Sequence, residues 1–231
     1  MVSSLLRIYT TNPNIFEMEN AAISLELSTQ ERCDGSAKAS IGMSSAIAGV
    51  YGPLESRITN ESIEGSIDIS FKAHISSSNP QEDADFSLIL KDVLERSAKN
   101  IPRTTITISV RVLADEGCGM STAMMAAVGA LVDSGVPLIH IPVGIEVTLD
   151  ENDSISFYPP LEKRNTSKVK MFLVFCGDEE SPCAWISTGP CSESEINKVV
   201  VQAREYALNV RKIIEKTVEN HVRKDLDLCV E

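Results

Sequence analysis

The sequence predicts a single α+β domain in which sheets pack around a buried central helix and a long helix follows at the end. Several segments alternate apolar and polar residues, as half-buried strands do. Residues 119–134 are apolar on nearly every face, which is typical of a helix buried on both sides. Residues 192–223 carry one apolar stripe at helical spacing. Strands and helices in this order indicate an α+β architecture.

The length and composition are those of a globular protein. The chain has 231 residues, of which 43% are hydrophobic and 23% charged, close to the globular average. No linker or internal repeat divides it, so we expect a variable lead-in over residues 1–20, one domain over 21–225 and a tail over 226–231. No stretch approaches about 18 apolar residues without charge, and the first residues lack the features of a signal peptide. We therefore expect an intracellular protein without a membrane segment.

The charge balance is acidic. The chain carries 21 Lys and Arg against 33 Asp and Glu, a formal net charge of -12. A protein that binds nucleic acid by itself usually has a basic footprint, so here that footprint must be local, supplied by a partner, or absent. The 6 cysteines include no C-x-x-C pair. A zinc site is therefore not expected, nor is any cofactor, and the thiols should stay reduced.

The first half of the chain is predicted to be mostly strands. Residues 23–27 alternate as a strand, and the turn signal Asp34-Gly35-Ser36 follows. Residues 37–51 are predicted to form one or two buried strands that are split at Gly42. A strand over 67–71 precedes a helix over 83–98, whose apolar residues recur at helical spacing. Residues 105–112 alternate most regularly of all and predict another strand.

The second half adds the buried helix and a second group of strands. The helix over 119–134 is expected to end at Gly135, with Pro137 as a stop signal. A strand over 138–149, a turn over 150–153 and a return strand over 154–158 come next, and then a strand pair over 168–176 and 183–188. Ser192 and Glu195 fit a capping box at the start of the last helix.

Two motifs resemble a known family. One comprises Asp34-Gly35-Ser36-Ala37, Gly42 and Ala48-Gly49-Val50-Tyr51-Gly52-Pro53, and the other runs from Ala126-Ala127 to Ala130-Leu131-Val132-Asp133-Ser134-Gly135-Val136-Pro137. Their order and their separation of about 80 residues resemble the ribonuclease PH family over roughly residues 20–222. The resemblance implies the fold of that family, which is of the ribosomal protein S5 domain 2-like type. Most matching residues are core or turn residues, so they indicate fold more strongly than activity.

Active members of the family use inorganic phosphate to cleave the last linkage of an RNA 3′ end. Such chemistry needs arginine and backbone N–H donors for phosphate, ideally at a helix N-terminus. The family's phosphate loop carries Ser-Arg, where this chain has a degenerate loop with Gly119, Met120 and Ser121. No arginine occurs between Arg111 and Arg164. Ser121, Thr122 and the helix N-terminus could hold an anion only weakly, and Asp115 and Glu116 would repel one.

Active members also hold a metal with carboxylates on later strands, to stabilise charge on the phosphoryl group. The resemblance places Tyr158 at the first of these positions and Ser167 or Lys168 at the second. Phosphorolysis is therefore expected to be lost. Glu162 is the one remaining catalytic candidate, since it lies in a region that some relatives use for hydrolytic chemistry. Mg²⁺ is expected only if residual nuclease activity exists.

Four basic or titratable residues are candidates for nucleic-acid contacts. Arg57 follows the Gly52-Pro53 turn, where relatives often carry a basic residue that faces the RNA. Lys72 and His74 follow the strand over 67–71, and Arg103 precedes the strand over 105–112. The alternative is that these are ordinary surface residues.

The resemblance implies a non-catalytic subunit of the RNA exosome core ring, which supports 3′–5′ processing of RNA, including ribosomal RNA, and RNA degradation. The expected partners are other ribonuclease PH-like subunits, cap subunits and RNA. The expected location is the nucleus, including the nucleolus, and the cytoplasm. Two alternatives remain open. One is an active exonuclease, and the other is a stand-alone homodimer that binds RNA or DNA and acts, alone or with another nuclease, in DNA degradation during cell death.

Overall fold

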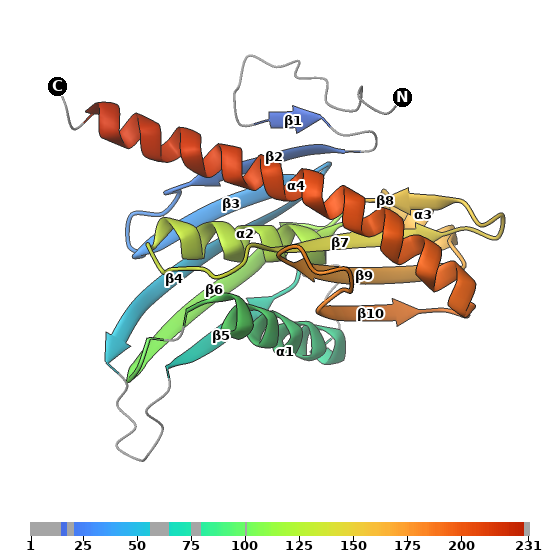
Figure 1. Ribbon diagram of the computed structural model, residues 1–231, viewed down its shortest axis with the longest axis horizontal. Helices are drawn as coiled ribbons and strands as arrows, with labels where there is room; N and C mark the ends of the chain where they lie inside the picture. Colours follow the sequence, from blue (N-terminus) through green and yellow to red (C-terminus); the bar gives the residue numbers. More distant parts are fainter. Residues whose placement is uncertain (1–14, 18–20, 56–64, 75–79, 100, 229–231) are drawn as a thin grey trace.

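Two sheets form the framework of the protein, a computed structural model that describes residues 15–17, 21–55, 65–74, 80–99 and 101–228 (Figure 1). The six-stranded sheet has the order β1-β2-β3-β4-β6-β5, and the four-stranded sheet has the order β10-β9-β7-β8. Adjacent strands are antiparallel except for β5 and β6. The strands are β1 (Ile15–Glu17), β2 (Ala22–Leu27), β3 (Gly35–Ile41), β4 (Ser44–Glu55), β5 (Ser66–Lys72), β6 (Thr104–Ala114), β7 (Pro142–Leu149), β8 (Ile155–Phe157), β9 (Val169–Cys176) and β10 (Ala184–Thr188).

Helices separate and cover these sheets. They are α1 (Pro80–Ser97), α2 (Gly119–Asp133), α3 (Leu161–Thr166) and α4 (Glu193–Leu228). Helix α2 contacts β3 and β4 on one side and β7 on the other, so it lies between the sheets. Helix α1 packs mainly on β5, and the long α4 crosses β7, β9 and β2 (Figure 1). No described helix is both long and apolar enough to cross a membrane.

Helix α2 is buried because its residues are small or apolar on all sides. Every residue from Ser121 to Leu131 is buried. A Cβ atom at Gly129 would lie 2.9 Å from both Ala37 Cβ and Leu25 Cδ1. This close approach of helix and sheet requires a glycine there, and it accounts for the Ala-rich sequence that predicted a buried helix.

The two family motifs contact each other, although about 80 residues separate them. Gly35 lies so close to the end of α2 that a Cβ atom would be 2.2 Å from the Ser134 nitrogen and 2.4 Å from the Ala130 oxygen. The Ser36 N–H donates to Asp133 Oδ2 at 2.8 Å. The Gly52 N–H donates to Asp34 Oδ2 at 2.7 Å. The motifs therefore form one structural junction between the six-stranded sheet and α2.

The predicted elements are confirmed in type, with differences at particular boundaries. The strand predicted over 138–149 begins only at Pro142, because Ile139 N–H instead donates to Ser97 O at 2.7 Å and Leu138 forms an isolated bridge with Ala98. Strand β1 lies inside the segment that we set apart as a lead-in. Helix α3 had no periodic signal, since it has only 6 residues. The capping box is present: the Ser192 N–H donates to Glu195 Oε2 at 2.5 Å, and the Glu195 N–H donates to Ser192 Oγ at 3.4 Å.

Candidate functional site

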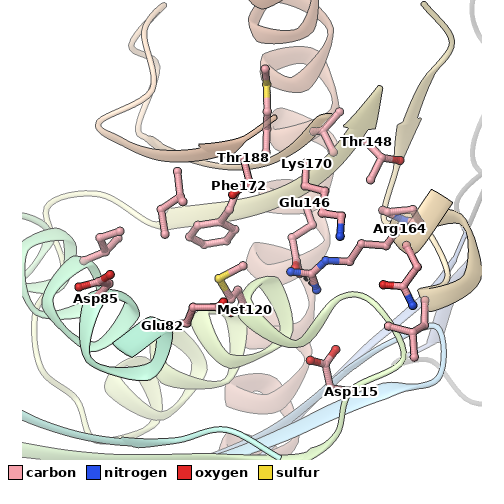
Figure 2. Close-up of a pocket in the computed structure, with 17 residues that line it drawn as sticks. Glu82, Asp85, Asp115, Met120, Glu146, Thr148, Arg164, Lys170, Phe172 and Thr188 are labelled. Carbon is pink, nitrogen blue, oxygen red and sulfur yellow. Dashed lines mark ion pairs between the residues drawn. The ribbon is translucent and has the colours of Figure 1, made fainter. Parts of the chain in front are cut away.

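A cavity of about 550 Å³ lies where the start of α2 meets the four-stranded sheet, α3 and the first turns of α1 (Figure 2). Two acidic and two basic side chains mark its opposite ends. Glu82 and Asp85 of α1 lie at one end, whereas Arg164 of α3 and Lys170 of β9 lie at the other. Met120 and Phe172 line the part between them. The degenerate phosphate loop, residues 115–122, therefore borders a real cavity.

Glu146 of β7 lies at the centre of this site, 3% exposed. Its Oε1 is 3.1 Å from Arg164 Nη1, and its Oε2 accepts a hydrogen bond of 3.1 Å from the Ser121 N–H. The contact between Arg164 and Glu146 is an ion pair, and the hydrogen bond of Arg164 Nη1 goes to Gly117 O at 3.1 Å. A carboxylate of the chain itself thus lies against the first turn of α2, where an N-terminal N–H group attracts negative charge.

Burial raises the pKa of Glu146 from its usual value of about 4.5 to about 7. The charge of Arg164 and the Ser121 N–H lower it and so limit the rise, whereas the charge of Asp115 adds to it. Glu146 therefore releases its proton near neutral pH, and its charge depends on Arg164 and the helix terminus for compensation.

Two other side chains, those of Asp115 and Ser44, accept hydrogen bonds from further N–H groups of the loop. Asp115 Oδ1 accepts hydrogen bonds from the N–H groups of Gly117 and Gly119, both at 3.1 Å. Ser44 Oγ accepts from the N–H groups of Glu116 at 2.9 Å and Cys118 at 3.2 Å. We expected Asp115 to repel an anion. The structure shows in addition that it accepts hydrogen bonds from the loop's own N–H donors.

The positions matched to the metal-binding carboxylates hold unsuitable side chains. Tyr158 is 2% exposed, and its hydroxyl donates to Gly144 O at 3.0 Å. Burial raises its pKa well above the usual value, so it stays a neutral phenol. Ser167 Oγ donates to Arg164 O at 2.8 Å, and Lys168 Nζ pairs with Glu195 Oε1 at 3.0 Å. These residues do not fit the carboxylate-held metal of the active family members, and we derive no step through one.

Glu162, the catalytic candidate from the sequence, is exposed on α3 and is not among the residues that line the cavity. Within the described residues, no three or more His, Cys, Asp or Glu side chains are grouped so as to hold a metal ion. The hydrolytic role of Glu162 stays an untested prediction.

The three candidate nucleic-acid contacts that lie within the described residues do not form one cluster. Arg57 lies outside the described residues. Arg103 is exposed directly before β6, where Thr104 pairs with Glu55. Lys72 ends β5 beside Arg111, with His74 two residues further on. Arg111 lies eight residues after Arg103, which corresponds to roughly 26 Å along the direction of β6.

Two central residues of the site were missed from the sequence. Glu146 is the one acidic residue of β7, a strand in which all eight residues are buried; a lone carboxylate in such an apolar run is a signal that could have identified it. Arg164 gave no local signal, because only the fold brings α3 to the start of α2.

The pH dependence of stability should report on Glu146. A carboxyl group with a raised pKa in the folded state binds a proton more tightly there than in the unfolded chain. Between pH 5 and pH 7 the free energy of unfolding of the wild type should thus fall relative to Glu146→Gln, by up to about 1.4 kcal/mol per pH unit, and level off above. Urea denaturation of both proteins at pH 5, 6, 7 and 8 measures this. A constant difference across the series would contradict the burial of an ionisable Glu146.

Comparison with known proteins gives a consistent set of similarities. The profile of the 3′ exoribonuclease family, domain 1, matches residues 19–137. The chain is 30% identical over 147 residues to the exosome complex exonuclease RRP46 homolog of Arabidopsis thaliana, covering 62% of this chain and 61% of that protein. It is 25% identical over 194 residues to the exosome complex component rrp46 of Schizosaccharomyces pombe, covering 78% and 82%.

Solved structures share the fold. The crystal structure of rice Rrp46 superposes with a TM-score of 0.80 at 23% identity, covering 90% of this chain and 97% of that one. An archaeal exosome core chain superposes with a TM-score of 0.72 at 14% identity, covering 84% and 86%. The motifs of this chain, together with Pro102-Arg103-Thr104, also resemble ribosomal RNA-processing protein 46 among exosome ring subunits. The expected ribonuclease PH-like fold is therefore confirmed.

Proposed function

Because the chain belongs to the 3′ exoribonuclease family of ribonuclease PH type, we propose that it is a non-catalytic subunit of an RNA exosome core ring, one that supports 3′–5′ RNA processing and degradation. The observation that carries the proposal is that N–H groups of the degenerate loop and of the first turn of α2 already donate to Glu146, Asp115 and Ser44. A phosphate that entered would find these donors in use.

Electrostatics supports the same proposal. Arg164 could attract phosphate, but Glu146 Oε1 lies 3.1 Å from its Nη1 and offsets its charge when Glu146 is ionised. Asp115, Glu82 and Asp85 also line the cavity. An incoming phosphate would have to displace a buried carboxylate and approach other acids, and like charges at close range in a partly buried site repel strongly.

The partners that we propose are other ribonuclease PH-like subunits, since the relatives named above are exosome components. Strand β10 is the edge of the four-stranded sheet, and its Trp185 is 48% exposed. An uncovered edge strand with an exposed aromatic side chain is suited to pairing with a neighbouring chain. RNA and cap subunits would meet the assembled ring, in the nucleus, nucleolus and cytoplasm.

Affinity purification of the tagged chain from its own cells tests this proposal. We expect other ribonuclease PH-like proteins to co-purify with it at one copy each. Trp185→Glu should weaken the recovery of one neighbour, whereas Val201→Glu, a change of an exposed side chain on α4, should leave recovery unchanged. Recovery of the wild type as a monomer or homodimer without such proteins would contradict the proposal. The comparisons give no support to the stand-alone, DNA-degrading homodimer.

A further inference from the structure

One face of the six-stranded sheet is left uncovered by helices. Helix α2 packs on the other face (Figure 1), where alternate residues of β3, β4 and β6 are buried. The side chains between them point away from α2. Many of these are small hydroxyl residues: Ser24, Ser40, Ser45, Ser70, Thr107 and Ser109. An antiparallel sheet can present one face to water, so exposure alone assigns no role to it.

The register of the strands places basic residues in one row across this face. Lys38 of β3 pairs with Ile47 of β4, Ile47 pairs with Arg111 of β6, and Arg111 pairs with Lys72 of β5. The three basic side chains are exposed. Since neighbouring strands lie about 4.8 Å apart, the row from Lys38 to Lys72 spans about 14 Å.

These cations lack partners within the part of the chain that the structure describes. No ion pair or hydrogen bond engages the side chains of Lys38, Arg111 or Lys72. Glu26, opposite Lys38 on β2, is the one acidic residue that the pairing adds to the row. The row is thus net positive in a chain whose formal net charge is -12.

We propose that this face binds the phosphate backbone of single-stranded RNA through Lys38, Arg111 and Lys72. The choice of RNA as the ligand rests on the proposed function. The binding surface is additional to it and lies on the side of the sheet opposite α2. Backbone contacts to nucleic acid come from Lys, Arg, Ser and Thr side chains, which is the composition of this face. The cores of protein–protein interfaces are instead aromatic and depleted of charge, so an acidic protein surface is the less suitable occupant.

Fluorescence anisotropy with a labelled 12-nucleotide oligouridylate and the full chain tests the proposal. The face variant is Lys38→Gln, Arg111→Gln and Lys72→Gln together. The matched control is Lys198→Gln, Lys212→Gln and Lys224→Gln, three exposed positions on α4. Both variants reach the same net charge, and none of the six side chains is buried. Equal melting temperatures verify that folding is intact.

We expect the face variant to bind at least about 10-fold more weakly than the wild type at 50 mM NaCl, and its slope of log K against log [salt] to be shallower by about 2, because about 0.7 is lost per phosphate contact. The control should stay within twofold. No binding by the wild type, or equal losses in both variants, would overturn the proposal while leaving ring assembly as a separate question. Unchanged RNA binding with loss of a ring protein would assign the face to protein docking.

Discussion

Removal of the Glu146 carboxylate should destabilise the protein and open its loop to external anions. Glu146→Ala leaves Arg164, whose side chain is 22% exposed, without its ion-pair partner and the Ser121 N–H without its acceptor. We expect a loss of about 1 to 3 kcal/mol in the free energy of unfolding, the cost of leaving a buried donor unsatisfied. The loss should be smaller at pH 8 than at pH 5, because the raised pKa of Glu146 means that its ionised form is itself costly to bury. Inorganic phosphate should then restore about 1.4 kcal/mol when present near ten times its Kd. Thermal denaturation with and without phosphate measures both effects.

The controls separate anion binding from general salt effects. The wild type and Glu146→Gln keep an acceptor for the Ser121 N–H. Phosphate should therefore change their melting temperatures no more than sodium chloride of equal ionic strength does. If phosphate stabilised the wild type as strongly as it stabilised Glu146→Ala, the wild-type loop would already bind phosphate. The interpretation that Glu146 occupies the donors of the loop would then be wrong.

Gly35→Ala should have the largest effect on folding. The added methyl group would lie 2.2 Å from the Ser134 nitrogen and 2.4 Å from the Ala130 oxygen. Both are backbone atoms at the end of α2, so neither can move without shifting the helix that lies between the sheets. We expect a destabilisation of about 3 kcal/mol or more, which lowers the melting temperature by roughly 10 °C in a domain of this size.

Gly49→Ala is the matched control. Its methyl group would lie 2.8 Å from Cys33 Sγ and 3.3 Å from Gln30 Oε1, which are side-chain atoms that can move. It should cost clearly less than Gly35→Ala. Equal melting temperatures for the two variants would show that the junction between β3 and α2 does not limit stability.

The fold could be predicted from the sequence because its signals are local and repeated. Alternation over 105–112 and the all-apolar run over 119–134 each follow from burial on one or two sides of an element. Boundaries were less predictable. The apolar residues before Pro142 looked like a continuing strand, but tertiary hydrogen bonds to Ser97 and Ala98 decide their conformation.

The site could be predicted only in part, for the same reason. The degenerate loop and Tyr158 were recognisable because their positions follow from motifs along the chain. The pairing of Glu146 with Arg164 depends on the packing of β7, α2 and α3, which no local pattern contains. The row of Lys38, Arg111 and Lys72 likewise depends on strand register, since β5 pairs in parallel with β6.

The absence of catalysis can be measured as the decay of an end-labelled single-stranded RNA by the purified chain, in Mg²⁺ with and without inorganic phosphate. We expect no shortening in either condition, because the loop's donors are occupied by Glu146, Asp115 and Ser44 and no carboxylates replace those matched to Tyr158 and Lys168. Phosphate-dependent release of nucleoside diphosphates would contradict this expectation, because it would require that phosphate displaces Glu146. Shortening without phosphate would also contradict it and would direct attention to Glu162.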